Sequence, residues 1–548
     1  MTRPQRLTLI ATILGSTIVF LDSTVVNVAL PAIEDDLDTG LAAQQWVMEA
    51  YLLTLVAFLL VGGSLGDLYG RRRLFGLGLA GFGVTSVLCA IAPSAEFLIG
   101  ARALQGATGA LLVPGSLAIL AATFEGEARG RAIGTWTAWA GISTLIGPAG
   151  GGLLIELDWR WIFWVNLPLI AVTLMLTRRA VAESSDPDAV RGIDGVGIGL
   201  SAAGLGGPVF ALIEQPTYGW GHPLVAIPLL AGVVCLAGFV WWESRARAPM
   251  MPLELFRSRN FSVVNGATLC VYAGLYGATF FLTLFLQQVA GYTPFEAGLA
   301  TTPVTVIMFV LSSRFGALSS RIGPRLVMGI GPLVSAAGLL LMGRLDAGGD
   351  YLGTVLPALL LFGFGLAMTV APLTTTVLDA VEDRHSGIAS GVNNAAARVA
   401  GLLAIAAFGA VISAQFSAKL DDQLGDRARA GEVANAVAEA KEQPLSGGVD
   451  GGLAPRTRRE LSAAVTDSSV SGFRLGMLIG AGLMVIGGAI GLAGVQNPRR
   501  EPKPGASVPP AAAAAAGECG RPGEPSQPSP VPGSLSPEPT GAGIDSAL

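Results

Sequence analysis

Long apolar segments alternate with short polar connections along the chain. A helix that crosses the hydrocarbon core of a bilayer needs about 20 predominantly apolar residues. Fourteen segments come close to that length, namely residues 7–30, 46–66, 74–92, 97–121, 132–155, 161–176, 193–213, 223–242, 261–286, 297–314, 326–343, 351–372, 386–413 and 473–495. The pattern predicts an all-α membrane protein with fourteen transmembrane helices.

The composition agrees with lipid as the main solvent. Hydrophobic residues make up 51% of the 548 residues and charged residues only 13%, whereas a soluble domain has about 25% charged residues. The four cysteines have neither paired nor metal-ligand spacing, so no disulfide framework, metal site or cofactor is predicted. One bundle in lipid fits the length better than several soluble domains.

Arginine is concentrated in alternate connections. Basic side chains resist transfer across the membrane, so cytoplasmic loops are enriched in Arg and Lys. One set of connections holds Arg71, Arg72, Arg73, Arg129, Arg131, Arg178, Arg179, Arg191, Arg245, Arg247, Arg257, Arg259, Arg321, Arg325 and Arg384. The alternate short connections hold only Arg160 and Arg344. With an even number of spans, this predicts a multi-pass plasma-membrane protein with both termini in the cytoplasm.

Two polar regions are longer than the others. The stretch 414–471 falls on the outside by the same count, because long loops translocate largely regardless of charge, and we expect short amphipathic helices around residues 418–442. Residues 496–548 hold 12 of the 33 prolines and an alanine run. Such a composition buries too little apolar surface to fold, so a disordered cytoplasmic tail is predicted.

One loop motif occurs twice. Residues 63–72 read GSLGDLYGRR after the second span, and residues 316–325 read GALSSRIGPR after the tenth, where Asp67 is replaced by Ser320 followed by Arg321. Spans seven and eight are then an insertion between two six-helix units. The expected architecture is six, two and six helices around a central cavity, divided into an N-terminal half (1–180), a linker with two extra helices (181–260) and a C-terminal half (261–495).

Three ionisable residues, Asp22, Glu49 and Arg102, lie inside predicted spans. A charge at the bilayer centre costs about 2.5 to 3.5 kcal/mol on insertion scales, so such residues usually face a cavity or one another. Asp22 and Arg102 both fall in the outer halves of their spans, where a contact between them is geometrically feasible. The alternative is a fixed ion pair that only orients helices. Glu49 falls about one turn from the outer end of its span and equally well reaches water.

Several motifs have counterparts in one transporter family. They are residues 62–73 (GGSLGDLYGRRR), 21–31 (LDSTVVNVALP), 102–106 (RALQG), 141–152 (GISTLIGPAGGG) and 159–168 (WRWIFWVNLP). Together they resemble the 14-span drug:proton antiporter branch of the major facilitator superfamily, over roughly residues 7–495. The resemblance implies that Arg102 takes part in proton coupling. We expect Asp22 to alternate between a proton and either Arg102 or substrate, because desolvation favours a neutral carboxyl and a nearby cation favours a charged one.

The same resemblance implies a conformational latch at the first loop motif, made by Gly63, Asp67, Gly70, Arg71 and Arg72. Asp67 is expected to pair with Arg71 or to accept hydrogen bonds from the N-terminus of a neighbouring helix. Such contacts hold the two halves together at the inner face and release them on opening. The alternative is a glycine turn that only sets topology.

The exporter motif of the fifth span contains Gly147, Pro148, Gly151 and Gly152. Proline removes a backbone donor, and glycine permits close approach of helices. A hinge and a packing seam are equally compatible with this pattern.

Other polar residues are candidates for the cavity. These are Asn27, Gln105, Asn393, Asn394 and Arg398, although helix packing is the favoured reading for the thirteenth span.

Residues with an expected place near the membrane surface form a separate group. Gln287 and Gln288 end the ninth span, where solvent contact is the simpler expectation. Trp136, Trp139, Trp161 and Trp164 are expected to form an interfacial belt.

The sequence therefore predicts a protein that is not an enzyme but a secondary active exporter, which exchanges an amphipathic drug or antibiotic for protons by alternating access. The ATP-binding motif GxxxxGK[ST] is absent from the sequence, which disfavours direct ATP drive. The expected partners are the small amphipathic substrate, protons and the lipid bilayer, without nucleic acid. The oligomeric state is open, with a monomer expected. The alternatives are an importer or facilitator of a small metabolite and, less favoured, a non-transporting sensor or a membrane-embedded enzyme.

Overall fold

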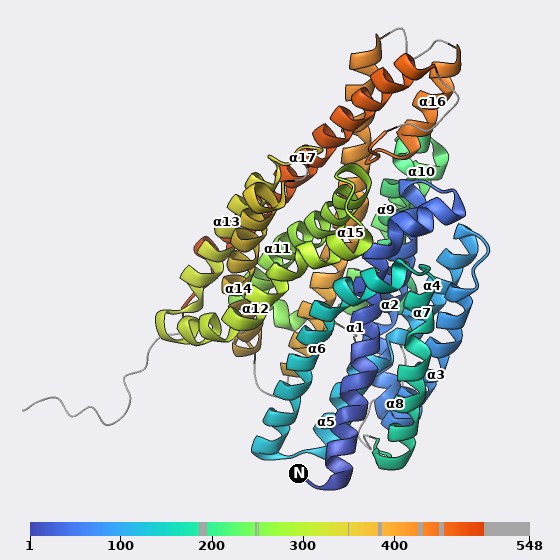
Figure 1. Cartoon of the computed structure of the whole chain (residues 1–548). Helices are drawn as coiled ribbons and strands as arrows, with labels where there is room; N and C mark the ends of the chain where they lie inside the picture. Colours follow the sequence, from blue (N-terminus) through green and yellow to red (C-terminus); the bar gives the residue numbers. More distant parts are fainter. Residues whose placement is uncertain are drawn as a thin grey trace, which may run out of the picture. The chain divides into compact units, whose positions relative to one another are not determined.

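The computed structural model describes residues 1–185, 194–246, 249, 251–348, 350–381, 386–425, 431–448 and 454–497. Regular structure within these ranges is helical, without a strand. Residues Met1–Asn497 form one compact unit (Figure 1). The tail from residue 498, predicted to be disordered, and Arg191, Arg247 and Arg384 lie outside the described residues.

The helices of the first six predicted spans are α1 (Arg3–Leu37), α2 (Leu41–Tyr69), α3 (Arg71–Ala90), α4 (Ala95–Gly109) with α5 (Leu112–Thr123), α6 (Gly126–Ile155), and α7 (Trp161–Trp164) with α8 (Asn166–Ala180). The next two spans are α9 (Gly195–Tyr218) and α10 (Pro223–Glu243).

After the short 3₁₀ helix η1 (Leu253–Arg257), the last six spans are α11 (Arg259–Leu284) with the π-helix η2 (Phe285–Val289), α12 (Pro294–Ile322), α13 (Pro324–Met342), the π-helix η3 (Tyr351–Val355) with α14 (Leu356–Asp379), α15 (Ser386–Leu424) and α17 (Pro455–Gly494). The helix α16 (Gly431–Glu442) precedes the last span.

Thirteen of these segments, among the described residues, are long and apolar enough to cross a membrane. The fifth expected span corresponds to α6, a helix of 30 residues whose described apolar part is Ile146–Ile155. The predicted all-α membrane protein is therefore confirmed, and helices overlap each of the fourteen expected segments, although α15 and α17 extend well beyond theirs.

The helices pack in two groups. Within the first group α1 contacts α5, α6 and α8, and α4 lies against α2 and α3. Within the second, α13 lies against α14 and α17, and α11 against α15 and α17. The pair α9 and α10 pack on each other, and α9 contacts both α2 and α15. These contacts suit two helical halves with an inserted helix pair, while the division at residues 180 and 260 stays a prediction.

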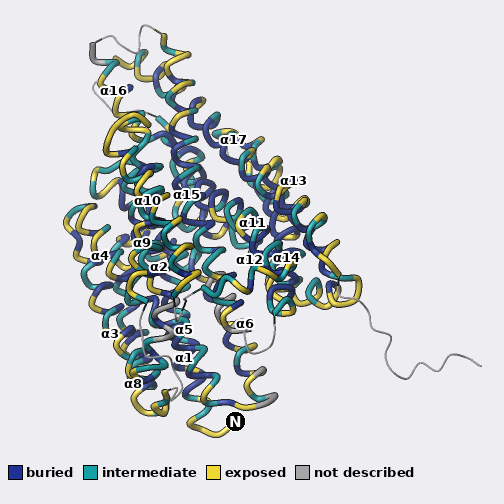
Figure 2. Tube along the Cα trace, turned by 180° about the vertical axis from the view of Figure 1, so that it is seen from behind, coloured by how far each residue is buried: buried dark blue, intermediate teal, exposed yellow. Residues whose placement is uncertain are grey.

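Residues are buried on the side of each helix that packs against other helices and exposed on its outer side. Figure 2 shows dark buried positions gathered where helices meet and yellow exposed positions along their outer sides. Many exposed positions are large apolar side chains, for example Leu77 at 63% and Val234 at 69%. A soluble protein rarely exposes contiguous apolar patches of such extent, whereas lipid accommodates them.

Two helices are longer than a membrane is thick. The helices α15 and α17 have 39 and 40 residues, or about 60 Å at 1.5 Å per residue, against a hydrocarbon core of about 30 Å. Their ends project beside α16, at the end of the bundle opposite the start of α1 (Figure 1). Phe416 and Leu420 of α15, Val437 of α16, and Leu461 and Val465 of α17 form a separate apolar cluster there. Within the region where short amphipathic helices were expected, residues 418–424 are the end of α15 and residues 431–442 form α16.

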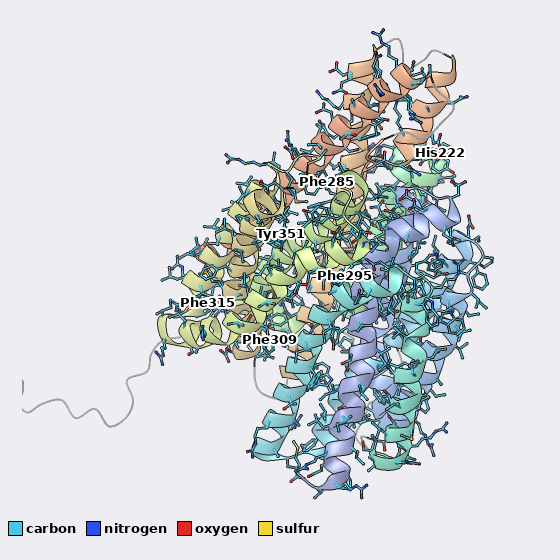
Figure 3. The ribbon with its side chains drawn as sticks, in the orientation of Figure 1. His222, Phe285, Phe295, Phe309, Phe315 and Tyr351 are labelled. Carbon is cyan, nitrogen blue, oxygen red and sulfur yellow. The ribbon has the colours of Figure 1, made fainter. Side chains whose placement is uncertain are left out.

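The exporter-motif glycines form a packing seam on α6. A Cβ atom on Gly147 would lie 2.2 Å from Thr24 Oγ1, and one on Gly151 would lie 2.5 Å from Val25 Cγ1, both on α1. On the other side, a Cβ on Gly152 would lie 2.5 Å from the Cα of Phe295, which begins α12 beside α6 (Figure 3). The seam therefore joins α6 to its own half and to the other half at once.

Pro148 belongs to the same seam, since its carbonyl oxygen would lie 2.3 Å from a Cβ on Gly298 of α12. Close packing between the halves thus explains these residues in this conformation. A hinge motion at Pro148 stays a prediction.

We expect Gly152→Ala to weaken the contact between α6 and α12. The added methyl group meets backbone atoms of Phe295, and overpacking of this kind costs about 1 to 3 kcal/mol. Thermal unfolding of the purified protein in detergent should show a lowered melting temperature. Gly150→Ala is the matched control, because its Cβ would make an ordinary 3.5 Å contact with Ile146. Equal melting temperatures for the two variants would contradict the seam.

Candidate functional site

Asp22 of α1 and Arg102 of α4 form a buried ion pair. Arg102 Nη1 donates to Asp22 Oδ2 over 2.6 Å, and the two side chains are 0% and 1% exposed, Arg102 first. The predicted contact between these residues is therefore present in the structure. Its role in proton coupling is a separate question.

Two amide side chains complete the coordination of Asp22. Gln105 Nε2 donates to Asp22 Oδ1 over 3.1 Å, and Asn166 Nδ2 donates to the same oxygen over 3.3 Å. Gln105 Oε1 in turn accepts from Arg102 Nη1 over 2.7 Å, since the two residues are three positions apart and share a face of α4. Helices α1, α4 and α8 thus meet in one polar network inside the N-terminal half.

Arg102 is held from several sides. Its Nε donates to the carbonyl oxygen of Val47 over 3.2 Å, and its guanidinium carbon lies 4.1 Å from the centre of the Tyr51 ring. A desolvated cation over an aromatic face gains about 2 kcal/mol. Arg102 Nη2 and Asn166 Oδ1, however, have no hydrogen-bond partner. Because most buried polar atoms are paired, the network holds one spare donor and one spare acceptor.

The local sequence places Arg102 at this depth. Ser94 caps α4 by accepting a hydrogen bond from the backbone amide of Phe97, which fixes the start of the helix. Arg102 then lies two turns inside the helix. Small residues on the same helix allow close approach, since a Cβ on Gly106 would lie 2.1 Å from the carbonyl oxygen of Tyr51.

Three members of the network were not assigned from the sequence. They are Tyr51 and Asn166, described above, and Ser86, whose hydroxyl oxygen accepts a hydrogen bond from Gln105 Nε2 over 3.0 Å. Gln105 itself was assigned to a cavity and instead lies inside this network, fully buried. Polar residues within apolar spans are the signal that the sequence offers, but spacing alone does not say which of them meet.

Glu49 of α2 does not reach water. Its side chain is 0% exposed, and neither carboxylate oxygen has a hydrogen-bond partner. The expectation that Glu49 equally well reaches water is therefore wrong, because α2 packs against other helices at this level rather than against solvent. A buried carboxyl group without a partner is costly when charged, so Glu49 remains a candidate for holding a proton.

The C-terminal half contributes polar groups from α15. Asn393 donates to Asn265 Oδ1 over 3.1 Å and to Thr268 Oγ1 over 2.8 Å, which is the packing role favoured from the sequence. Asn394 is exposed. Arg398 is half-buried and close enough to Tyr51 to interact with it electrostatically, which brings a second cation near the Asp22 network.

The residues of the expected latch lie within the first half. Asp67 Oδ1 lies 2.7 Å from Arg71 Nη2, one helical turn away, and the backbone amide of Arg72 donates to Glu183 Oε1 over 3.0 Å. Gly70 has a φ of 105°, which favours glycine at the turn. The expected pair of Asp67 with Arg71 is present. Gly63 lies outside the residues whose surroundings are described.

Polar residues join the two halves near the α16 end. Asn27 Nδ2 donates to Thr283 Oγ1 over 3.4 Å, and Gln45 Nε2 donates to the carbonyl oxygen of Ile405 over 2.7 Å. Gln287 Nε2 donates to the carbonyl oxygen of Val28 over 3.0 Å.

The last of these contacts corrects the expectation for Gln287 and Gln288. Both side chains remain partly exposed, but solvent contact is not their whole environment, since Gln288 also donates to Glu34 in the first half. The predicted aromatic belt is wrong for Trp136, which is buried and donates to Ser16 Oγ over 3.0 Å. Helix-to-helix contacts of this kind are not visible in the local sequence.

Thirteen helices in the described part of the chain are long and apolar enough to cross a membrane, and a charged network is buried among those of the N-terminal half. The family model of the Major Facilitator Superfamily matches residues 12–426. The chain belongs to the major facilitator superfamily, whose members are transporters and not enzymes.

Relatives and solved structures agree with this assignment. The chain is 37% identical over 495 residues to the Multidrug resistance protein Stp of Mycobacterium tuberculosis, covering 89% of this chain and 91% of that protein. It is 33% identical to the Tetracenomycin C resistance and export protein of Streptomyces glaucescens, covering 88% and 90%.

Among solved structures, an inward-facing bacterial homologue of the human lysosomal transporter Spinster has a TM-score of 0.61 at 17% identity, covering 91% of this chain and all of that one. The inward-open xylose transporter XylE of E. coli has a TM-score of 0.56 at 13% identity, covering 90% and 97%. These likenesses concern the fold.

We expect Asp22→Asn to destabilise the protein by about 3 to 5 kcal/mol, because Arg102 then stays buried without a counterion. Adding Arg102→Gln should recover part of the loss, since the orphaned charge is removed. Chemical unfolding of the single and double variants measures the coupling between the two side chains. Strictly additive losses would show that the pair is not an energetic unit.

Proposed function

We propose that this protein is a proton-coupled exporter of amphipathic drugs or antibiotics in the plasma membrane, with both termini in the cytoplasm. The printed functions of the relatives, multidrug resistance and export of tetracenomycin C, support the substrate class. The arginine-rich connections support the orientation, because the end at which α1 starts is the basic one.

The observation that carries the proposal is the buried carboxyl group of Asp22 beside Arg102. In the structure its carboxylate has Arg102 as counterion and two amide donors. A proton on Asp22 would remove the charge and leave Arg102 without its partner inside a dry network. Asp22 can therefore either pair with Arg102 or bind a proton. The exchange of protons for a cargo requires a site with two such states.

Alternating access determines the side of the membrane from which a proton reaches Asp22 and the side to which it is released. The hydrogen bonds of Asn27, Gln45, Gln287 and Gln288 and the seam at Gly152 join the halves towards the α16 end. At the basic end, Asp67 and Arg71 pair within their own half. This arrangement supports an inward-open conformation, in which a proton taken up from outside is released to the cytoplasm.

The driving force is adequate for export. Moving one charge through a potential of 100 mV supplies about 2.3 kcal/mol, in addition to any pH difference. Because one chain provides both halves, a monomer is expected to transport. Arg398 of α15 interacts electrostatically with Tyr51, and it is the residue through which we expect the second half to sense the charge state of Asp22.

The test uses everted membrane vesicles that are acid inside, with tetracenomycin C, the cargo named for one relative, as the probe. Wild-type protein should accumulate the probe in the lumen, and an uncoupler should abolish the accumulation. Asp22→Asn and Arg102→Ala should each lower the initial rate by at least about tenfold, which corresponds to about 1.4 kcal/mol. Asp421→Asn is the control, because Asp421 forms an exposed pair with Lys441.

The outcomes separate the alternatives. Accumulation that survives the uncoupler would identify a facilitator, and uptake into intact cells in place of vesicles would identify an importer. Full activity of both Asp22→Asn and Arg102→Ala, at membrane levels matched to the control, would refute the role of the ion pair.

A further inference from the structure

A second carboxyl group is buried where the two halves meet. Glu34 lies in the last turn of α1 and is 4% exposed. Its Oε2 accepts hydrogen bonds from Gln44 Nε2 of α2 and from Gln288 Nε2 of η2. One oxygen of Glu34 therefore connects α1 and α2 of the first half with the end of the ninth span in the second.

Neighbouring side chains also join the two halves near Glu34, and this junction is here called the outer gate. Gln287, beside Gln288, binds the carbonyl oxygen of Val28 on α1, and Gln45, beside Gln44, binds that of Ile405 on α15. Gln45, Gln287 and Gln288 thus reach across the same boundary. Separation of the halves at the α16 end breaks these three contacts, including the one between Gln288 and Glu34.

The segment after α16 covers the gate. A Cβ on Gly40, between α1 and α2, would lie 2.7 Å from the carbonyl oxygen of Glu442, and one on Gly447 would lie 2.7 Å from that of Gln288. Leu445 between them is 2% exposed and belongs to the main apolar core. Residues 443–448, here called the cover segment, thus lie against both halves next to Glu34.

The surroundings of Glu34 suit a neutral carboxyl better than a charged one. In the described part of the chain, its contacts with α2 and η2 come from the neutral amides of Gln44 and Gln288. The charged group that interacts with it electrostatically is also acidic, namely Asp35 on its own helix. A buried carboxylate without a cation is costly, whereas a neutral carboxyl is tolerated when it is hydrogen-bonded.

A side-chain oxygen beside Glu34 could accept a hydrogen bond from the protonated carboxyl group. Gln44 Oε1 is buried and has no hydrogen-bond partner, although Gln44 Nε2 contacts Glu34. The two ends of an amide exchange by a half-turn of the side chain and are distinguished only by their partners. After that rotation, a protonated Glu34 would donate to Gln44 Oε1 and still accept from Gln288.

We propose that Glu34 is a second proton-binding site, whose protonation holds the α16 end closed between α1, α2 and η2 beneath the cover segment. Release of the proton leaves a charged carboxylate that requires hydration, and the gate opens to supply it. Acid outside the cell thus closes the outer gate behind a proton taken up there. This last step rests on the proposed function, whereas the effect of protons on the gate does not.

The test measures gate opening without substrate or gradient. Spin labels are placed at Leu157 after α6 and Leu352 in η3, which are 75% and 73% exposed, with the native cysteines replaced by serine. Distances are recorded in lipid nanodiscs as the pH is raised. The ratio of open to closed protein should rise by up to about tenfold per pH unit where one proton is released on opening.

Glu34→Gln should keep the gate closed, with an open-to-closed ratio at least about tenfold below wild type at the highest pH. Asp35→Asn, at the adjacent and exposed carboxyl, removes a like charge near Glu34 but keeps the proton-binding group, so it should still open as the pH rises and reach the wild-type ratio at the highest pH. Gln288→Met, which leaves α1 unchanged, should open more at every pH because it removes one hydrogen bond of the closed state.

Two results would overturn the proposal. One is a Glu34→Gln variant whose open-to-closed ratio equals that of wild type throughout. The other is an Asp35→Asn variant that closes as strongly as Glu34→Gln. Since no cargo is involved, failure of the efflux assay would leave this result standing, and the reverse also holds.

Discussion

The cost of burying charge in a membrane protein governs the arrangement of this molecule. Asp22 and Arg102 are both fully buried and tolerate that burial because each has the other, 2.6 Å away. Gln105 and Asn166 satisfy the remaining carboxylate oxygen, so α1, α4 and α8 have one permitted register relative to one another. Any step that changes the charge of Asp22 disturbs all three helices together.

A different kind of contact joins the two halves. Where α6 meets α12, glycines bring backbones together, as at Gly152 and Gly298. Around Glu34, the amide side chains of Gln287 and Gln288 bridge the boundary instead. Neither contact includes a paired opposite charge, so separation of the halves at these points leaves no buried charge without its counterion. The ion pair of Asp22 and Arg102, in contrast, lies within one half.

The sequence was sufficient for the fold and for part of the site. Apolar length and arginine placement predicted the spans, and the depth of Asp22 and Arg102 in their spans allowed the contact that is found. It was insufficient for Glu49, Gln288 and Trp136. Their surroundings are set by helices far away in the sequence, and a position near the end of a span does not reveal whether lipid, water or another helix covers it.

The central claim is that Asp22 exchanges Arg102 for a proton. Infrared difference spectroscopy of the purified protein between acidic and alkaline buffer measures this most directly, because a protonated carboxyl and a carboxylate absorb at different frequencies. The account predicts a protonated-carboxyl band at low pH that is lost in Asp22→Asn and retained in Asp421→Asn. A wild-type spectrum identical to that of Asp22→Asn over the whole range would contradict it.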